Sequence, residues 1–270
     1  MNTIAVATDF SAAADNAMMY AAQLAKKLSA DLLLIHAYQM PVSMNEVPVM
    51  MIPVEEIKNS AEAGLERVKQ SVQKNYPNVA VDTETRLGDA ATEIPECCEQ
   101  VKPILLVAGK QGAGGVERFL FGNTALSIIR HSKMPVIVVP QTTATFSLTN
   151  IALAVDDSNV HMHEPAIQKL CAATFASLHI VHVKQYHENR LHTQDIFKEL
   201  KPQLHTITNE SFVSGIKQFL HNHAIDMLII IPHQHSWMER IFFKTHTADL
   251  LEKVSIPIMC LPERNEESGQ

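Results

Sequence analysis

The 270-residue chain contains no apolar run near the roughly 20 residues that a membrane-crossing helix requires, and Met1-Asn2-Thr3 lacks the basic start of a signal peptide. Basic residues are few, with 22 Lys and Arg against 29 Asp and Glu, so the formal net charge is -7. No cluster of Lys and Arg is evident, although binding to a nucleic-acid backbone depends on one. We therefore expect a cytoplasmic protein whose partners include neither a membrane nor a nucleic acid.

Motifs for metal binding, redox chemistry and nucleophilic catalysis are also missing. The four cysteines form no Cys-x-x-Cys pair, so we interpret them as small core residues. The chain shows no Ser/His/Asp arrangement around a nucleophile turn and no paired-carboxylate motif. The sequence thus predicts no catalytic residue.

What the chain does contain is an internal repeat. The segment Ile4–Ser11 reads IAVATDFS, and Ile151–Ser158 reads IALAVDDS. Two further echoes follow in the same order, since Ile35–Gln39 resembles Val181–Gln185 and Val116–Phe121 resembles Met238–Phe243. Because the order is kept, each half is predicted to be one copy of a fold.

Short apolar, β-branched runs alternate with helical stretches in each copy, which indicates a parallel sheet covered by helices. The strands predicted in the first copy are Thr3–Thr8, Leu32–Tyr38, Val79–Arg86, Ile104–Ala108 and Val136–Val139. The helices predicted between them are Ala12–Leu28, Glu55–Asn75, Ala90–Val101 and Thr124–His131. The strands predicted in the second copy are Asn150–Val155, Ser177–Lys184, Leu204–Glu210, Asp226–Ile231 and Pro257–Leu261. The fold class is therefore α/β, with two tandem doubly wound domains.

Three segments fall outside this alternation. The polar stretch Gln141–Thr149 is predicted to be a linker, so we place domain 1 at residues 1–143 and domain 2 at residues 149–264. The charged tail Glu263–Gln270 is expected to be disordered. Prolines break the Met-rich segment Met40–Val54, so it is either a flap packed on its own domain or an adaptable contact for a partner chain.

A glycine loop follows the fourth predicted strand. Gly109 ends the strand, Gly112 and Gly122 follow, and Asn123-Thr124 opens a helix. Glycines let backbone N–H groups turn toward an anion, and a helix start adds free N–H groups and the positive end of its dipole. Asn123 and Thr124 could cap the helix or contact phosphate. The spacing alone fits a phosphate cradle and an ordinary loop equally well.

The run Ala7-Thr8-Asp9-Phe10-Ser11, this loop and Pro135–Pro140 together resemble the universal stress protein family, and the resemblance covers both halves. It implies domains of the adenine nucleotide alpha hydrolase-like type, each with a five-stranded parallel sheet of order 3-2-1-4-5. In that family a Gly-x2-Gly-x9-Gly-Ser/Thr loop accompanies ATP binding. The first copy keeps all three glycines, whereas Asn123 departs from the family's Ser or Thr.

This resemblance implies that the first copy binds ATP, with or without Mg²⁺. Asp9 would accept hydrogen bonds from the ribose, small residues would line the adenine slot, and the glycine loop would hold the phosphates. The residues implied at the site are Ala7, Thr8, Asp9, Ala37, Ala108, Gly109, Gly112, Gly122, Asn123 and Thr124. The family implies slow or absent turnover, so ATP hydrolysis is at most slow.

The second copy keeps the acidic position as Asp156, but Pro232 and His235 stand where Gly109 and Gly112 would be. These side chains obstruct a backbone phosphate cradle, so no ordinary ATP site is expected there. In the family, copies pair through their last strands. An internal pseudo-dimer of the two domains and a homodimer are therefore both candidate assemblies.

All but two of the 14 histidines follow residue 150. His161 and His163 follow the first strand of the second copy, and His233 and His235 follow the fourth, so both pairs approach one crevice if the sheet order is kept. Imidazole nitrogens suit Zn²⁺, and hydrated loop histidines are the other interpretation.

These patterns leave three hypotheses for function. The main one is a stress-response module that binds ATP in domain 1, while a degenerate domain 2 serves pairing or regulation. The second is a stress or adaptor protein without nucleotide, whose histidine-rich crevice holds a metal or a small ligand. The third is a slow ATP hydrolase.

Overall fold

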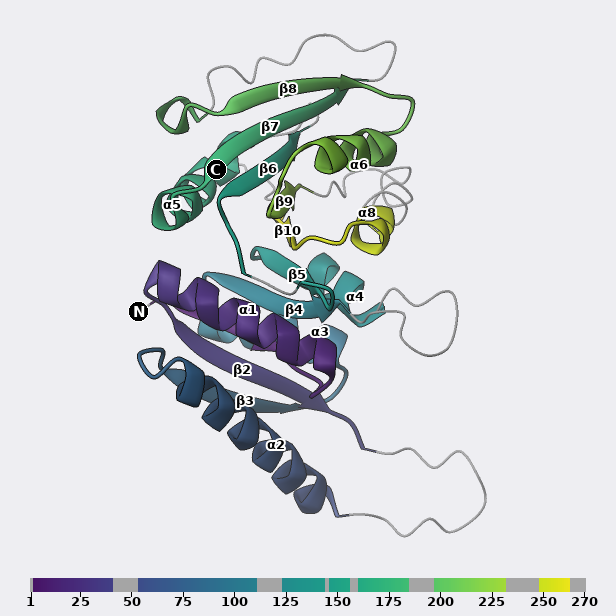
Figure 1. Cartoon of the computed structure of the whole chain (residues 1–270). Coiled ribbons are helices and arrows are strands. Elements are labelled where there is room, and N and C mark those ends of the chain that lie inside the picture. Colours follow the sequence, from purple (N-terminus) through teal and green to yellow (C-terminus); the bar gives the residue numbers. More distant parts are fainter. Residues whose placement is uncertain are drawn as a thin grey trace, which may run out of the picture. The chain divides into compact units, whose positions relative to one another are not determined.

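The computed structural model describes residues 2–40, 53–110, 123–143, 146–155, 160–184, 197–231 and 248–262. The chain divides into two compact units, Met1–Ser132 and Lys133–Gln270, each built from alternating strands and helices (Figure 1). The fifth strand of the first repeat falls in the second unit. The domain limits at residues 143 and 149, which the sequence places on the other side of that strand, stay a prediction.

The first unit contains a four-stranded parallel sheet of order β3-β2-β1-β4. Its strands are β1 (Thr3–Ala7), β2 (Asp31–Tyr38), β3 (Val81–Leu87) and β4 (Leu105–Lys110). The central strand β1 is fully apolar after its first residue, as a strand covered on both faces requires, whereas the edge strand β3 alternates charged and polar residues. The sheet confirms the predicted order for the first four strands.

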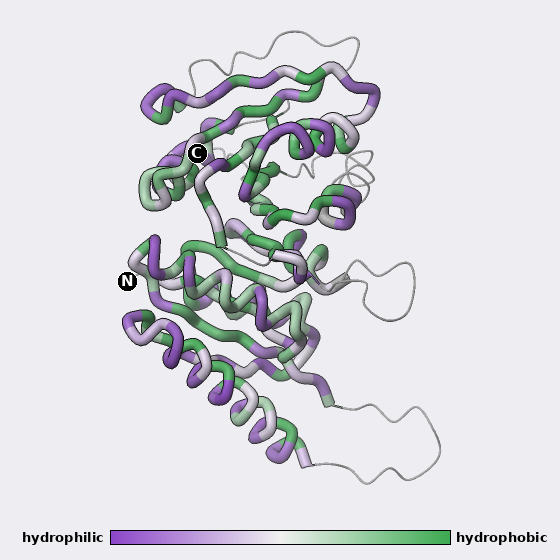
Figure 2. Tube along the Cα trace, in the orientation of Figure 1, coloured by the Kyte–Doolittle hydropathy of each residue, from purple (hydrophilic) through white to green (hydrophobic). Residues whose placement is uncertain are grey.

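Helices α1 (Ala12–Leu28), α2 (Val54–Asn75), α3 (Ala90–Val101) and α4 (Asn123–His131) complete the first unit. The side chain of Ser11 caps α1 by accepting a hydrogen bond from Ala14 N, and Asp89 caps α3 in the same way through Ala91 N. Figure 2 shows that α2 carries many hydrophilic residues, whereas β2 is largely hydrophobic. Among the described residues, no helix is both long and apolar enough to cross a membrane.

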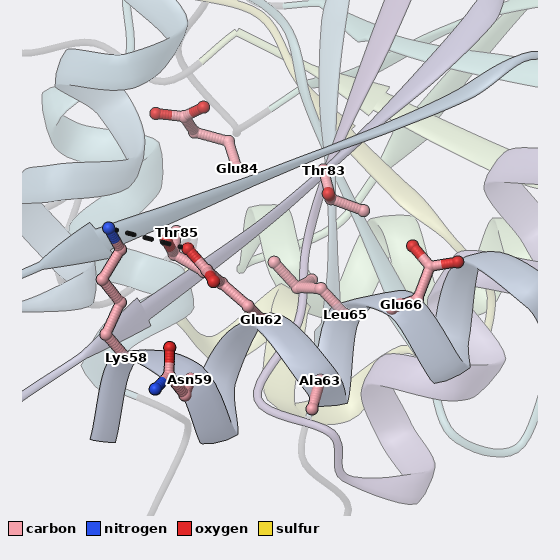
Figure 3. Close-up of a pocket in the computed structure, with 9 residues that line it drawn as sticks. All are labelled: Lys58, Asn59, Glu62, Ala63, Leu65, Glu66, Thr83, Glu84 and Thr85. Carbon is pink, nitrogen blue, oxygen red and sulfur yellow. Dashed lines mark ion pairs between the residues drawn. The ribbon is translucent and has the colours of Figure 1, made fainter. Parts of the chain in front are cut away.

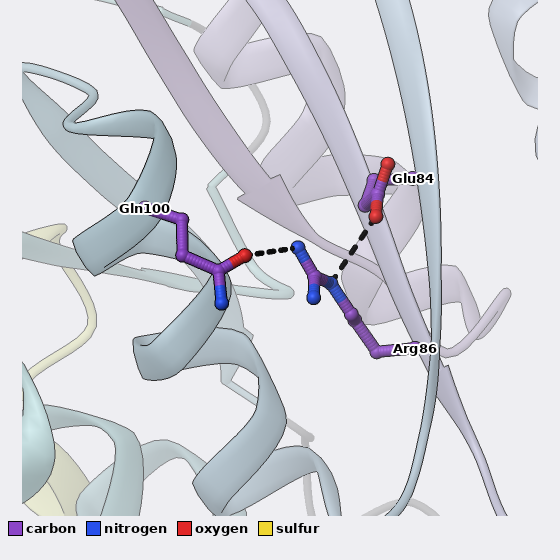
Figure 4. Close-up of polar contacts among 3 residues, drawn as sticks. All are labelled: Glu84, Arg86 and Gln100. Carbon is purple, nitrogen blue, oxygen red and sulfur yellow. Dashed lines mark hydrogen bonds and ion pairs between the residues drawn. The ribbon is translucent and has the colours of Figure 1, made fainter.

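Arg86 joins the edge strand β3 to α3 (Figure 4). Its Nε lies 3.2 Å from Glu84 Oε1, and its Nη2 donates a hydrogen bond of 2.8 Å to Gln100 Oε1. Because a charged edge strand resists pairing with a second sheet, these contacts serve both packing and solubility.

The second unit contains the strand order β5-β10-β9-β6-β7-β8. Its strands are β5 (Val136–Pro140), β6 (Asn150–Val155), β7 (Ser177–Lys184), β8 (Gln203–Thr208), β9 (Met227–Ile230) and β10 (Ile258–Cys260). Its described helices are η1 (Val160–His163), α5 (Glu164–Thr174), η3 (Lys198–Leu200), α6 (Phe212–Asn222) and α8 (Ala248–Lys253). The parallel run β8-β7-β6-β9-β10 is the predicted order 3-2-1-4-5 for the second repeat.

The last strands of the two repeats pair with each other inside the chain. β5 and β10 are antiparallel, and Ile137 lies opposite Met259, with Val136 opposite Cys260 and Val138 opposite Ile258. Prolines bound both strands in the sequence, at Pro135 and Pro140 and at Pro257 and Pro262. When these prolines are aligned, Ile137 and Met259 are equivalent residues. The pair therefore has a local two-fold pseudosymmetry, and the predicted contact between last strands is confirmed within the chain.

All four cysteines are buried and free, which confirms their interpretation as core residues. Burial raises the pKa of the Cys98 thiol to about 12, with a smaller contribution from Cys97. Burial also raises the pKa of Cys171 to about 11. Because the thiolate is the reactive form, these side chains are inert at neutral pH.

A histidine cluster (His179, His205 and His223) links β7, β8 and the end of α6. Asn150 Nδ2 donates to Ala224 O, which turns its Oδ1 toward His179 Nε2 at 3.4 Å. His179 therefore donates from Nε2 and accepts at Nδ1, where His205 Nε2 approaches to 3.1 Å. Neutral His179 satisfies both contacts with a single ring proton.

Burial, followed by the charge of His223, lowers the pKa of His179. Burial, followed by His179 and His223, also lowers the pKa of His205. His223 donates from Nδ1 to Phe219 O at 3.0 Å, and its ring stacks on the Phe219 ring with centroids 4.1 Å apart. A positive charge on His179 would be poorly solvated, because this residue is only 7% exposed.

We predict that the second unit loses stability as the pH falls through about 6.5, the ordinary pKa of histidine. The folded-state pKa values of His179 and His205 are lowered, so the unfolded chain binds more protons in this window and stability falls with pH by at most about 1.4 kcal/mol per pH unit for each histidine. Thermal unfolding from pH 8 to pH 5 measures the slope. His205→Gln should flatten it, and an equal slope in that variant would contradict the assignment.

Candidate functional site

The carboxyl ends of β1, β2 and β4 meet at one edge of the sheet in the first unit. Ala7 ends β1 and pairs with Ile35, two residues before Ala37. Val6 pairs with Val107 on β4, so the next residue, Ala108, lies level with Ala7. Because side chains alternate along strands, the three alanine methyl groups share one face of the sheet. The structure thus places the three predicted adenine-lining alanines on the same face of the sheet.

The loop after β1 is folded by its own polar side chains. Thr8 N donates to Ile35 O at 3.0 Å, and Thr8 Oγ1 accepts from Phe10 N at 3.1 Å. Asp9 Oδ1 accepts from Ser11 N at 3.0 Å. Thr8 is buried and Asp9 is exposed, so the loop presents a carboxylate of fixed orientation to the solvent.

The other Asp9 carboxylate oxygen, Oδ2, has no hydrogen-bond partner within the described residues. Asp15, in the first turn of α1, is a second acidic group at this edge. Partial desolvation, followed by the charge of Asp9, raises the pKa of Asp15. The two carboxylates therefore repel each other, and a cation beside them would reduce that repulsion.

Gly109 lies against the start of α1. A Cβ atom at this position would be 2.6 Å from Ala13 O and 2.9 Å from Ala14 N, closer than any side chain tolerates. The glycine is thus required by the close approach of β4 to the first turn of α1, whether or not a phosphate binds. The end of β4 is consequently adjacent to a helix N-terminus.

The rest of the predicted phosphate loop is described only at its end. Gly112 and Gly122 lie outside the described residues, as does the side chain of Asn123. Asn123 and Thr124 begin α4 as the sequence predicts, and Thr124 is exposed. The role of this loop in phosphate binding stays a prediction.

The strand register corrects the predicted equivalence of Gly109 and Pro232. Ile4 pairs with Leu105, and its repeat equivalent Ile151 pairs with Met227. Counting forward from these pairs, Ile231 is equivalent to Gly109, one residue earlier than the sequence comparison suggested. The two loops differ in composition, so they could not be aligned without the strand pairing. A branched side chain stands at the position where the first repeat has no space for one.

The helix start in the second repeat also differs. The segment equivalent to the start of α1 is the 3-10 turn η1, and α5 begins only at Glu164. His161 is exposed on this turn, whereas His163 is 5% exposed. The two predicted metal-binding histidines thus differ in their access to solvent.

Among the described residues, no three His, Cys, Asp or Glu side chains are placed to hold a metal ion. The other predicted pair, His233 and His235, lies outside the described residues. The zinc site stays a prediction.

A polar groove lies elsewhere in the first unit, between α2 and the edge strand β3 (Figure 3). It contains the Lys58–Glu62 ion pair, 3.7 Å between Nζ and Oε1, and a further acidic side chain from each element, Glu66 and Glu84. No sequence pattern predicted this groove. It is separate from the carboxyl edge where the predicted site residues lie.

Three residues at the site had no predicted role. Phe10 lies in the family motif without an implied role, and His36 has an equivalent residue in the second repeat, His182. Gly64 lies in α2, where a Cβ atom would be 2.7 Å from the Phe10 ring. A glycine inside a helix pattern was the available sequence signal for this close approach.

The sheet order defines a doubly wound α/β protein, in which β1 and β4 flank the point where the strand order reverses. Residues 1–140 match the model of the Universal stress protein family. The chain belongs to this family.

The relatives agree with this assignment. Universal stress protein MJ0531 from Methanocaldococcus jannaschii is 31% identical over 144 residues, which are 50% of this chain and 80% of the relative. A universal stress protein from Archaeoglobus fulgidus has a structure that matches with a TM-score of 0.74 at 16% identity, over 97% of this chain and 98% of its own. A functionally unknown protein from Pseudomonas aeruginosa matches with a TM-score of 0.66 at 14% identity, over 97% and 92%. At these identities the two structures show the fold alone, and they show it for the whole tandem chain.

We predict that Gly109→Ala destabilises the first unit by about 1–3 kcal/mol, because its Cβ would overlap the backbone of Ala13. Gly109→Val should cost more, since its methyl groups add to the overlap. Thermal or denaturant unfolding measures both. Equal stability of the alanine variant and the natural protein would contradict the close approach of β4 to α1.

Proposed function

We propose that this protein is a nucleotide-binding stress-response module, in which domain 1 (residues 1–143) binds ATP and domain 2 (residues 149–264) serves pairing or regulation. The observation that supports this proposal best is the Asp9 carboxylate. Its Oδ1 is held by Ser11 N, and Asp9 follows β1 at the carboxyl edge of the sheet, two residues after Ala7. A ribose offers two neighbouring hydroxyl donors, and an oriented carboxylate is their natural acceptor.

The small residues at this edge suit the adenine ring. Ala7, Ala37 and Ala108 share one sheet face, and we propose that the edge of the adenine ring lies against them.

The phosphates would follow from Gly109 toward the start of α4. We propose that Gly109, Gly112, Gly122 and the Asn123-Thr124 helix start supply the N–H groups that hold them. Asp9 and Asp15 create a negative field at the same edge, which disfavours a free polyphosphate. This field supports ATP bound together with Mg²⁺, whose preferred ligands are carboxylate and phosphate oxygens.

Two other functions remain as alternatives. A non-nucleotide stress or adaptor protein would use the histidines of the second repeat for metal or a small ligand. A slow ATP hydrolase would use the same ATP site. Within the described residues at this edge, Asp9 and Asp15 are the acidic side chains available to position a water, and no histidine is paired with them as a general base. Slow or absent turnover therefore fits better than efficient hydrolysis.

Calorimetry with magnesium present and zinc excluded is expected to give about one ATP per chain. The second repeat has Ile231 in place of Gly109 and should contribute no site. Two sites per chain would contradict a degenerate second repeat. No binding, with no nucleotide in the protein as purified, would refute the ATP proposal and favour the histidine-rich crevice.

Asp9→Asn should weaken ATP binding by at least about 10-fold, because a charged acceptor is replaced by a neutral one. Asparagine keeps an oxygen for Ser11 N, so the loop should stay folded and the thermal midpoint should change little. The matched variant Asp156→Asn, at the equivalent position of the second repeat, should bind ATP normally. An equal loss of ATP affinity in both variants would contradict a site confined to the first repeat.

Gly112→Val separates the ATP proposal from the adaptor alternative. A bulky side chain in the cradle should abolish nucleotide binding, and phosphate release as well if any hydrolysis occurs. Under the adaptor alternative the same change should leave binding of Zn²⁺ unchanged. Parallel titrations with ATP and Zn²⁺ distinguish the two.

A further inference from the structure

The loop that carries Asp9 contains a backbone conformation that needs external support. Phe10 has φ of 62°, in the left-handed region that bulky residues rarely adopt. Phe10 is also 37% exposed, so burial of its ring in the core does not hold it there. Contacts with neighbouring elements add to the local hydrogen bonds of Thr8 and Asp9 in stabilising this turn.

The first contact comes from His36 on β2. His36 Nδ1 lies 2.8 Å from Thr8 O, and since a carbonyl only accepts, Nδ1 carries the proton and donates. Thr8 N already donates to Ile35 O at 3.0 Å. Both backbone polar groups of Thr8 are thus fixed by β2, immediately before Asp9.

The second contact is the Phe10 ring itself. It packs on the His36 ring with centroids 4.3 Å apart and planes inclined by 39°. At its Cζ end it lies against α2 at Gly64, where even a Cβ atom would come within 2.7 Å of Phe10 Cζ. Glycine inside a helix is unfavourable relative to alanine, and space for this ring is the physical reason for it here.

We infer that Phe10, His36 and Gly64 form an aromatic latch that positions the Asp9 carboxylate for nucleotide binding. Asp9 lies between two residues that the latch holds, Thr8 through its carbonyl and Phe10 through its ring. The latch acts through Asp9 and touches no nucleotide, so its members are positioning residues. This inference rests on the proposed function, because it assigns Asp9 to the ribose.

The latch also couples α2 to the site. Any displacement of α2 at Gly64 would free the Phe10 ring, and the strained turn would then relax toward ordinary backbone conformations. By thermodynamic reciprocity, nucleotide held on Asp9 would favour the docked position of α2. The second repeat keeps the histidine as His182 but has Asp157 in place of Phe10, so it lacks the latch.

The test is a set of His36 variants that separates the Nδ1 donor from the rest of the ring. Asparagine places an N–H close to the position of Nδ1, whereas glutamine reaches toward Nε2 and leucine has no donor. The Kd for ATP with magnesium should rise about 5- to 10-fold in His36→Leu and His36→Gln, as expected for one lost hydrogen bond, and stay within about 2-fold in His36→Asn. The control His182→Leu should leave the Kd unchanged.

Gly64→Ala tests the ring contact from the opposite side. Helix propensity alone predicts an equal or higher thermal midpoint for this variant. The latch predicts a Kd for ATP about 3- to 10-fold higher, because the new methyl group displaces Phe10. An unchanged Kd in both Gly64→Ala and His36→Leu would overturn the inference, as would equal weakening by His36→Asn and His36→Leu.

Amide hydrogen exchange at Ser11, measured by NMR without nucleotide, tests the latch independently of ATP binding. The Ser11 N–H donates to Asp9 Oδ1, so its exchange reports the turn directly. Faster exchange in His36→Leu than in His36→Asn supports the latch even if the natural protein binds no ATP, a result that would refute only the proposed function. Equal exchange in the natural protein and His36→Leu overturns the latch.

Discussion

The backbone of Thr8 is the point on which the candidate site depends. Two hydrogen bonds join it to β2: Thr8 N donates to Ile35 O at 3.0 Å, and His36 Nδ1 donates to Thr8 O at 2.8 Å. These bonds fix the direction of the chain after β1. Asp9 therefore lies at the carboxyl edge of the sheet, and α1 begins three residues later. The first turn of α1 then closes on Gly109 so tightly that β4 can have no side chain there.

Much of the fold could be predicted because parallel strands covered on both faces need apolar, β-branched runs. β1, β2 and β7 were placed to within a residue or so, and even the half-exposed β8 was found. The ends of β4 and the unit to which β5 belongs were not predictable in the same way. Strand ends depend on hydrogen bonds to neighbouring strands, and those partners are distant in the sequence.

The site was predictable where one short motif carries it and not where distant residues meet. Asp9 and the small residues follow from the strand-end pattern, whereas Phe10, His36 and Gly64 have no common local pattern and come together only in the folded unit. The predicted equivalence of Gly109 with Pro232 failed for a similar reason. The loops after β4 and β9 are dissimilar in sequence. Only the pairing of β1 with β4, and of β6 with β9, shows which of their residues are equivalent.

The pseudosymmetric pair of β5 and β10 has a consequence for how such a chain could arise. Its centre joins equivalent residues, Ile137 and Met259, so the contact is self-complementary. A single ancestral domain with this strand could pair with a second copy of itself, and every residue of β5 is buried by such an edge. Gene duplication would then replace a concentration-dependent dimer by a tethered one, since a covalent link keeps the partner strand at a high effective concentration. After duplication the two halves need not have the same sequence. One half could therefore lose the glycines of its loop and still pair through its last strand.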